Sequence, residues 1–555
     1  MLRSVVGKLG CLSLSLLACS SEGSPNADTG GLTTTGLSDA TGSSSESSSS
    51  ASETGSTSSS TADDTSDAST DTAEATTSTD SGPLLDVLPG DTTATGETGG
   101  SVPIDCDNID MVEDTSVGCE FWSTNWTVSS GFGMAIGVGN PTDDIATVSI
   151  EQNVGGTVQT ITTEMLGAGE SSLIQIDGPG GLLAGNYQVA VGANPLAALH
   201  IVSDVPITAM QVAPAGGADT HISEASLLLP QNSLREAYFA AGYNSFSGSQ
   251  GRVAVVGTED GTTINTSSGT TTINRWDVQV YSGADITGFF VGADKKVAVF
   301  SGNAGTFIPS GMYASDHLQE QMVPAASWGT SYVGGRHPVR YTASNLEAEP
   351  VYWRAIAGED DTTINLTPAV AGASVNIPNA GGFIEFTSTE SFLAESDKPF
   401  LLLQYMSGCE NVVPMPLVST NPCNEPGTGD PFMIQTPPIE QWLDALPFLT
   451  DSSYPRDFVV ITREVGTTVS LDCLGEVDAS HFVAIPGTNY EVGTVELDLL
   501  DMEGGEGNCQ DGAQFLTASA PVGVIVGGVD WATSYGYPGG LAFQDLWTPP
   551  FDPPG

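Results

Sequence analysis

The sequence predicts an all-β protein: a tandem of about four β-rich units, each of roughly 100 residues, preceded by a disordered stalk. Three observations lead to this fold class. A short turn motif recurs between β-branched segments, a second motif recurs before apolar runs, and the chain contains 66 glycines and 33 prolines. Few stretches have helical periodicity, and residues 440–446 are the best of these short candidates.

The first residues have the layout of a secretory leader. Arg3 and Lys8 precede an apolar run that is too short to cross a bilayer as a helix, and residues 16–19 read Leu-Leu-Ala-Cys. This tetrapeptide resembles a bacterial lipobox, in which the leader is removed and the cysteine is acylated. We therefore predict a lipoprotein signal peptide over residues 1–18 and lipidation of Cys19. The alternative is an ordinary cleaved signal peptide that happens to end near a cysteine.

Residues 19–100 form the predicted linker. From residue 20 onward the segment consists mainly of Ser, Thr, Gly, Ala, Asp and Glu and contains no Lys or Arg. It has too little apolar surface to offset the entropy lost on ordering, so we expect a disordered tether. The expected location is the bacterial cell surface, at the outer membrane, because Ser20 rather than an aspartate follows the lipidated residue.

Residues 101–555 form the β-rich head, which is too long for one hydrophobic core. The chain has 67 acidic and 13 basic residues and a formal net charge of −54. This charge repels nucleic acid and anionic lipid, so a nucleic-acid partner is not expected. A solvated acidic surface is the simpler explanation of the charge, and bound Ca²⁺ is the alternative.

Internal repeats define the units of the head. Residues 259–265 read Glu-Asp-Gly-Thr-Thr-Ile-Asn, and residues 359–365 read Glu-Asp-Asp-Thr-Thr-Ile-Asn. Shorter copies lie at residues 465–469 and 143–148, and each copy predicts a hairpin turn. A second motif, such as Ser-Asp-Val-Pro at residues 203–206, precedes a buried strand.

Joins between units are predicted near residues 215–230, 305–325 and 410–435. The units are sandwich-like and lie in a row, or they are sheets arranged radially as in a propeller. The first arrangement is favoured because the repeat is about twice as long as a usual propeller blade, although one pair of blades for each repeat is also compatible.

Six cysteines remain after Cys11 leaves with the leader and Cys19 is lipidated. An even number in an exported chain favours disulfides, and pairing between neighbours in sequence is the preferred arrangement. The unit that has Asn303 in place of Cys409 also lacks a counterpart of Cys423, which supports their pairing. The expected pairs are Cys106 with Cys119, Cys409 with Cys423, and Cys473 with Cys509.

The ordered motifs resemble the N-terminal domain family of the IgGFc-binding protein. The resemblance covers residues 105–547 and rests on the motifs at 203–209, 224–230, 316–324 and 359–364. It implies a β-rich binding domain of the kind found in bacterial surface lipoproteins with Ser/Thr-rich stalks. Family members often carry cysteines near the Asp-His-Leu segment, where this chain has Ala304 and Ser315.

Few residues suggest catalysis or metal binding. Asp316, His317 and Glu320 are the weak candidates for a metal site, because these side chains could share an ion on a helical turn. Packing of His317 at a join between units is the simpler interpretation. The acidic residues at 143–144 and 359–361 fit turns better than a Ca²⁺ site. Aromatic residues are assigned to the core rather than to carbohydrate platforms: Trp122, Trp126, Trp353 and Trp531.

Two functions remain open at this stage. The favoured one is a non-enzymatic surface lipoprotein whose head binds a protein or glycan, in adhesion or matrix contact. The alternative is a secreted polysaccharide hydrolase, which needs two carboxyls about 5–10 Å apart across a cleft. The sequence shows no carboxyl pair outside predicted turns. A deep groove lined by acidic residues and tryptophan would favour the hydrolase.

Overall fold

A computed structural model covers the whole chain. The predicted signal peptide, Cys19 and the linker to residue 100 lie outside the residues that the structure describes. The described ranges are 105–109, 115–126, 132–183, 188–246, 250–312, 314–340, 348–412, 423, 427–499 and 505–554.

The head contains four structural repeats, here called repeats 1 to 4. In each repeat, antiparallel strands pair with the two halves of one long bent strand. In repeat 1, the first half of β7 (Leu199–Ala213) pairs with β1 and β3, and its second half pairs with β2 and β8. The equivalent strands are β14 (Phe290–Thr306) in repeat 2 and β30 (Ala513–Asp530) in repeat 4. Repeat 3 divides this strand into β21 (Phe392–Ser396) and β22 (Phe400–Tyr405).

The other strands of each repeat have between 2 and 10 residues, and some of the described connections contain a single 3-10 turn. The strands of repeats 1 and 2 are β1 (Gly118–Ser123), β2 (Ala135–Gly139), β3 (Ala146–Val154), β4 (Thr157–Leu166), β5 (Ser171–Gln175), β6 (Gly192–Asn194), β8 (Glu224–Leu227), β9 (Arg235–Phe239), β10 (Gly251–Gly257), β11 (Thr262–Thr266), β12 (Gly269–Ile273), β13 (Val278–Gly283) and β15 (Asp316–Gln321).

Repeats 3 and 4 contain the remaining strands in the same order. They are β16 (Ser331–Gly334), β17 (Val351–Ala357), β18 (Thr362–Thr367), β19 (Asn376–Ile377), β20 (Phe383–Ser388), β23 (Met433–Gln435), β24 (Leu443–Leu449), β25 (Arg456–Glu464), β26 (Val469–Leu471), β27 (Gly475–Glu476), β28 (Phe482–Ala484), β29 (Tyr490–Leu499) and β31 (Thr533–Pro538). The described 3-10 turns are η2 (Gly217–Asp219), η3 (Gln231–Ser233), η4 (Ala325–Ser327), η5 (Cys409–Asn411), η7 (Ile439–Gln441) and η8 (Ala479–His481).

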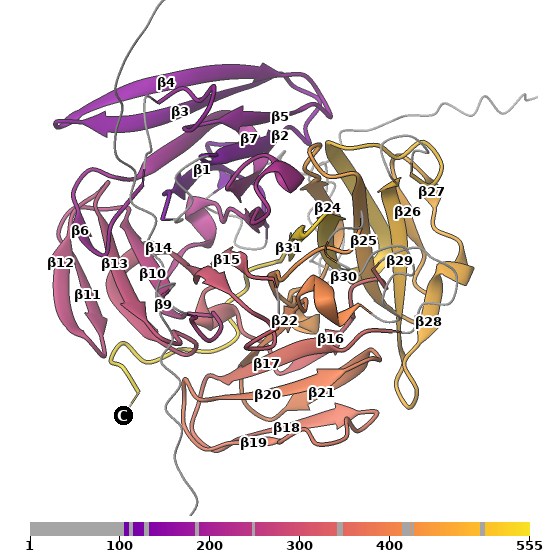
Figure 1. Cartoon of the computed structure of the whole chain (residues 1–555). Coiled ribbons are helices and arrows are strands. Elements are labelled where there is room, and N and C mark those ends of the chain that lie inside the picture. Colours follow the sequence, from indigo (N-terminus) through magenta and orange to yellow (C-terminus); the bar gives the residue numbers. More distant parts are fainter. Residues whose placement is uncertain are drawn as a thin grey trace, which may run out of the picture. The chain divides into compact units, whose positions relative to one another are not determined.

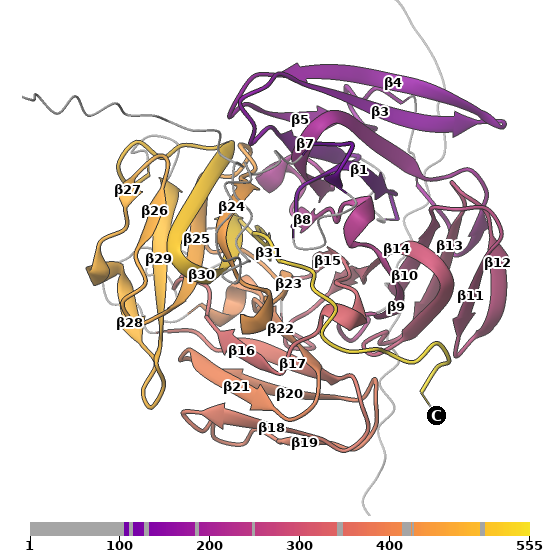
Figure 2. The ribbon, with the colours of Figure 1, turned by 180° about the vertical axis from the view of Figure 1, so that it is seen from behind.

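The last strand of every repeat lies on the inside, between the four sheets. Strand β8 contacts β15, β15 contacts β23, β23 contacts β31, and β31 returns to β8. Figure 1 shows the sheets placed around these inner strands, and all four strands are labelled in the reverse view of Figure 2. The repeats therefore close into a ring.

Glutamine side chains join neighbouring repeats at equivalent positions of this ring. The Gln321 side chain of β15 accepts a hydrogen bond from the Leu229 amide at 2.9 Å. The Gln435 side chain of β23 accepts one from the Val323 amide at 2.8 Å, and its own NH₂ group donates to the Gln321 carbonyl at 2.9 Å. These bonds satisfy backbone groups that have no partner within their own sheet.

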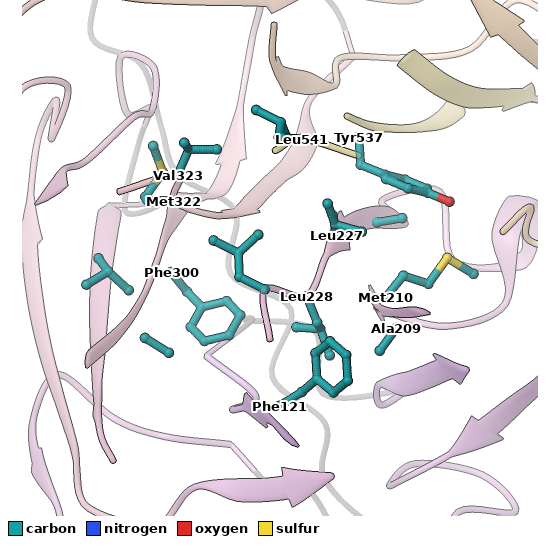
Figure 3. Packing of buried hydrophobic residues seen from close by; sticks show 14 of the residues in the cluster. Phe121, Ala209, Met210, Leu227, Leu228, Phe300, Met322, Val323, Tyr537 and Leu541 are labelled. Atoms are coloured by element: carbon teal, nitrogen blue, oxygen red, sulfur yellow. The ribbon is translucent and has the colours of Figure 1, made fainter. Parts of the chain in front are cut away.

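The largest hydrophobic core is shared by all four repeats rather than confined to one. Figure 3 shows Phe121 and Leu227 of repeat 1 near Phe300 of repeat 2 and Tyr537 of repeat 4. Leu403 of repeat 3 belongs to the same cluster. Burial of one such side chain contributes about 1.5–3 kcal/mol, so the ring is stabilised mainly by apolar packing at its centre.

The segment that follows β31 crosses to repeat 2. The guanidinium of Arg235 donates to the Asp545 carboxylate at 2.8 Å, and the Trp547 indole donates to the Ala325 carbonyl. The C-terminal segment is therefore held against repeat 2 by contacts between residues that lie far apart in the sequence.

The all-β prediction is confirmed, and each predicted copy of the turn motif lies between equivalent strands. The hairpin predicted at each copy is wrong, because the two flanking strands pair with different halves of the bent strand and not with each other, as β10 and β11 do with β14. Of the two arrangements left open, the radial one matches the ring of inner strands. The repeat exceeds a usual propeller blade in length because each repeat holds two half-sheets joined by a bent strand. The predicted helix over residues 440–446 is wrong: η7 and the start of β24 occupy this segment, because backbone pairing with β30 outweighs its weak helical pattern. Among the described residues, no helix is long and apolar enough to span a bilayer.

Candidate binding site

The inner strands begin at one end of the ring, and a cavity of about 440 Å³ lies there. We call it the axial pocket. Its lining comes from the segments that precede all four inner strands, including His221 before β8, Ala314 before β15, Asp430 before β23 and Trp531 before β31. Because every repeat contributes to it, the pocket exists only when the ring is closed.

Left-handed backbone conformations shape three of these four segments. His221, Gly429 and Ala532 have φ values of 57°, 57° and 54°. Glycine adopts this conformation freely, whereas a residue with a side chain is disfavoured by roughly 1–2 kcal/mol. His221 and Ala532 are therefore held in a conformation that the ring imposes at the mouth of the pocket.

Aromatic side chains form two walls of the axial pocket. The rings of Phe246 and Phe307 lie with their centroids 4.3 Å apart, and both side chains are half-buried. The rings of His221 and Trp531 make an edge-to-face contact at 5.6 Å. Trp531 is 43% exposed, so the prediction that it belongs to the core is wrong, whereas Trp122, Trp126 and Trp353 are buried as predicted.

Asp430 is the single acidic residue among the described residues that line the pocket. Its Oδ1 accepts a hydrogen bond from the Cys409 amide at 3.1 Å, and its own amide donates to the Ser534 hydroxyl at 2.8 Å. Its Oδ2 is buried and has no hydrogen-bond partner in the described structure. Burial raises the pKa of Asp430 to about 7.

Asp316, at the start of β15, lies beneath Asp430. Burial raises the pKa of Asp316 well above its ordinary value, and the negative charges of Asp430 and Glu224 raise it further. Because two neighbouring carboxyls cannot both ionise in a medium of low dielectric constant, this pair holds a proton near neutral pH.

Glu224 and Glu320 lie deeper among the inner strands. The Ser226 hydroxyl donates to the Glu320 carboxyl at 3.1 Å, and the Gly536 amide donates to Glu224 at 3.0 Å. Burial raises the pKa of both carboxyls well above the ordinary value. In their protonated forms they act as polar links between repeats.

The weak metal candidates do not lie on a helical turn. Asp316, His317 and Glu320 all belong to β15, and alternation along a strand places His317 on the opposite face from the other two. His317 packs against Trp126 with ring centroids 5.2 Å apart, and burial lowers its pKa to about 4, so it is a neutral core residue. Within the described residues, no three potential ligands are grouped around a common point.

The repeated acidic residues lie in turns. Residues 143–144, 259–261 and 359–361 each lie between two strands of their repeat. The hydroxyls of Thr262 and Thr362 donate to the carbonyls of Glu259 and Glu359 at 2.8 and 2.7 Å. These bonds fix the turns, which accounts for the motif without an ion.

Three disulfides link the pairs of cysteines that lie closest in the sequence: Cys106–Cys119, Cys409–Cys423 and Cys473–Cys509. The second bridge lies at the axial pocket, since Cys423 lines it and the Cys409 amide bonds Asp430.

Paired carboxylates, which a hydrolase requires, do not line the axial pocket or four further cavities formed by the described residues. Each of these four cavities is lined by one acidic residue. Glycoside hydrolysis needs an acid and a second carboxylate facing each other. The geometry therefore favours binding over hydrolysis.

Sequence reasoning missed Asp430, Phe246, Phe307 and His221 as site residues. They are separated by up to 209 positions and belong to no shared motif, so only ring closure brings them together. The one available indication was positional: His221, Phe307 and Asp430 lie at the predicted joins, whereas Phe246 does not.

The fold and the pocket define a class: a cyclic all-β repeat protein with a ligand-sized cavity at one end of its inner strands. Family comparison matches residues 224–528, more than half of the chain, to IgGFc binding protein. The chain belongs to the IgGFc-binding protein family. The match begins at β8 and ends within β30, so the structure adds β1–β7 of repeat 1 to the matched region. No curated protein matches the chain.

Membership in this family indicates a binding protein, and the expected resemblance is confirmed.

Proposed function

We propose that this protein is an exported lipoprotein, anchored through Cys19, whose head binds a protein ligand at the axial pocket in adhesion or matrix contact. The observation that carries the binding role is the pocket itself, because it combines the exposed Trp531 and the half-buried Phe246 and Phe307 with a buried carboxyl that has an oxygen without a partner in the described structure. Aromatic side chains at a concave surface are typical of recognition sites.

Three further observations support export and a surface location. The three disulfides suit an oxidising compartment rather than the cytosol. Residues 16–19 have the lipobox pattern, and residues 19–100 are long enough, as a flexible chain of about 50 Å mean span, to hold the head away from the bilayer. The family name attributes binding of the immunoglobulin Fc region to its namesake, and we extend only protein binding to this chain.

The anchor is tested by replacing Cys19 with Ser and fractionating cells that express each protein. We expect the wild-type chain in the membrane fraction and the variant in the soluble exported fraction. Replacement of Cys11, which lies within the proposed leader, is the matched control and should leave the distribution unchanged. Membrane retention of C19S would contradict the anchor.

Binding is tested with the purified full chain immobilised through its N-terminal segment and exposed to candidate protein mixtures, immunoglobulin G among them. We expect capture by the wild-type chain and reduced capture by Trp531→Ala, which shortens one wall of the pocket. Equal capture by both proteins would place the ligand elsewhere on the head.

A further inference from the structure

The chemical character of the axial pocket is aromatic and anionic. Its described lining contains Phe246, Phe307 and Trp531 but no Lys or Arg, and Asp430 supplies its single carboxyl. Aromatic faces attract organic cations through the ring quadrupole, and a carboxylate attracts them through its charge. Neither group favours an anionic ligand.

Asp430 lines this cavity and has an unused acceptor. In the part of the chain that the structure describes, its Oδ2 is buried without a hydrogen-bond partner, while Oδ1 is held by the Cys409 amide. A buried polar atom without a partner is costly in a folded protein, so it marks a position that a ligand donor can satisfy. An ammonium N–H is the donor that gains most from a carboxylate, because the hydrogen bond is charge-assisted.

Long-range electrostatics favour the same class of ligand. The formal net charge of the chain is −54, which draws cations toward the head and repels anions. The nearest protein cation, Arg340, is already occupied: its guanidinium bonds Glu349 at 3.1 Å and the carbonyls of Ser407 and Thr428 at 2.8 Å. It is therefore not free to enter the pocket.

We propose that the axial pocket binds an alkylammonium group, with the ammonium on Asp430 Oδ2 and its alkyl carbons between the Phe246–Phe307 pair and Trp531. This inference rests on the proposed binding function and names its ligand chemistry. A lysine side chain of a protein ligand and a free small amine both present this group.

Binding of the cation is coupled to release of a proton. The titratable and charged groups around Asp430 are Asp316 on β15, Glu410 on η5, Arg340 after β16 and His221 before β8. Burial raises the pKa of Asp430 to about 7, so roughly a tenth of the protein holds the ionised form at pH 6 and most of it does at pH 8. Because only the ionised form attracts the ammonium, affinity rises about tenfold over this interval.

The test is calorimetric titration of the purified full chain with n-butylammonium chloride at pH 6 and pH 8, with n-butanol as the uncharged control. We expect the amine to bind more tightly than the alcohol, and about tenfold more tightly at pH 8 than at pH 6. Asp430→Asn keeps the Oδ1 acceptor but removes the charge, so it should weaken amine binding at pH 8 about 10- to 100-fold and abolish the pH dependence.

Two further variants keep the proposal open to refutation if Asp430→Asn fails to fold. Trp531→Ala should weaken amine binding, because it removes an exposed wall without opening the core. Phe551→Ala, an exposed aromatic residue that does not line the pocket, is the matched control and should bind as the wild type does. Equal affinity for amine and alcohol, or full amine affinity in Trp531→Ala, would overturn the proposal.

Two short unstructured peptides distinguish the sources of the amine. One contains a single lysine, and the other has norleucine in place of that lysine. Tighter binding of the lysine peptide than of n-butylammonium identifies a protein lysine, and equal binding identifies a free amine. If neither amine binds but the head still captures protein, and Asp430→Asn does not reduce the capture, the ammonium proposal fails while the proposed function stands.

Discussion

The backbone amide of Gly536 donates a hydrogen bond to Glu224 Oε1 at 3.0 Å, although the two residues are 312 positions apart. Glu224 begins β8 in repeat 1 and Gly536 lies within β31 in repeat 4. This bond therefore joins the first inner strand to the last. It adds a polar contact to the apolar packing that closes the ring, and the axial pocket depends on that closure.

Replacement of Glu224 should show that its protonated form, not its charge, supports the closure. We expect Glu224→Ala to lower the free energy of unfolding by about 1–3 kcal/mol, because the Gly536 amide would remain buried without an acceptor. Glu224→Gln keeps an acceptor oxygen and should cost less than 1 kcal/mol. Urea denaturation monitored by tryptophan fluorescence measures both.

The exposed Glu236 on β9 provides the control for this pair of variants. Glu236→Ala should stay within about 0.5 kcal/mol of the wild type. A Gln variant as destabilised as the Ala variant would show that the ionised carboxylate is required, contrary to the burial of Glu224.

Stability of the head should fall as pH rises above about 5. Burial raises the pKa of each of seven carboxyls in the described structure: Glu224, Asp316, Glu320, Asp430, Asp444, Asp451 and Asp457. The folded head retains these protons where the unfolded chain releases them, above a pKa of roughly 4, so folding is favoured most at low pH and weakens toward pH 8.

An opposing contribution sets the lower limit of this pH window. Burial alone would raise the pKa of Glu349, but His337, Arg340 and Arg336 outweigh it and hold the value at about 2. The ionised Glu349 carboxylate stabilises the folded head above the ordinary glutamate pKa, and this stabilisation is lost as pH falls toward 2. The melting temperature should therefore be highest near pH 5. A melting temperature that increases steadily from pH 5 to pH 8 would contradict this account.

Much of the repeat could be predicted from the sequence because its turns are local. Gly261, Asp361 and Gly466 are equivalent residues of the turn motif. All three have positive φ, with values of 67°, 54° and 94°. A short-range steric requirement selects glycine or aspartate there, and such a requirement leaves a visible pattern.

The two repeated motifs also contact one another. Asp294 Oδ1 accepts from the Thr263 amide at 2.7 Å, and Asp204 Oδ1 accepts from the Thr147 amide at 2.6 Å. In repeat 4 a serine hydroxyl replaces the carboxylate. The sequence showed both motifs but not their contact, because the partners lie 31 and 57 positions apart and pair only after the strands assemble.

Ring closure and the axial pocket had no comparable pattern in the sequence. They arise from single residues in different repeats, such as Asp430 and Trp531, that need no shared spacing. Trp531 was assigned to the core because tryptophan is usually buried, yet its position at the turn before β31 exposes it.

The three disulfides should stabilise the head to different degrees. A bridge restricts the unfolded chain more when it closes a longer loop, so the 36-residue separation of Cys473–Cys509 predicts about 4 kcal/mol, against about 3 kcal/mol for the separations of 13 and 14. Each pair is replaced by two serines, and the free energy of unfolding is compared with that of the wild type. A larger loss from removing Cys106–Cys119 than from removing Cys473–Cys509 would show that native-state contacts dominate.

Glycine at position 361 should stabilise the protein. Asp361 is exposed and has a φ of 54°, a conformation that disfavours any residue with a side chain, whereas the equivalent positions in repeats 2 and 4 hold glycine. Asp361 makes its described hydrogen bonds through its backbone: its amide donates to the Pro378 carbonyl at 3.1 Å, and its carbonyl accepts from Lys398. Relief of the backbone strain exceeds the added entropy of the unfolded chain, so Asp361→Gly should gain roughly 0.5 kcal/mol.

The neighbouring aspartate gives this prediction its control. Asp360 Oδ1 accepts a hydrogen bond from the Ala380 amide at 2.9 Å, so Asp360→Gly removes a contact and should cost about 1 kcal/mol. Asp361→Val should also destabilise, since a β-branched residue tolerates positive φ least. Thermal unfolding of the three variants distinguishes strain at one backbone position from a general preference for glycine in the turn. If both glycine variants shift the melting temperature in the same direction, the backbone conformation of residue 361 does not determine which side chain is favoured there.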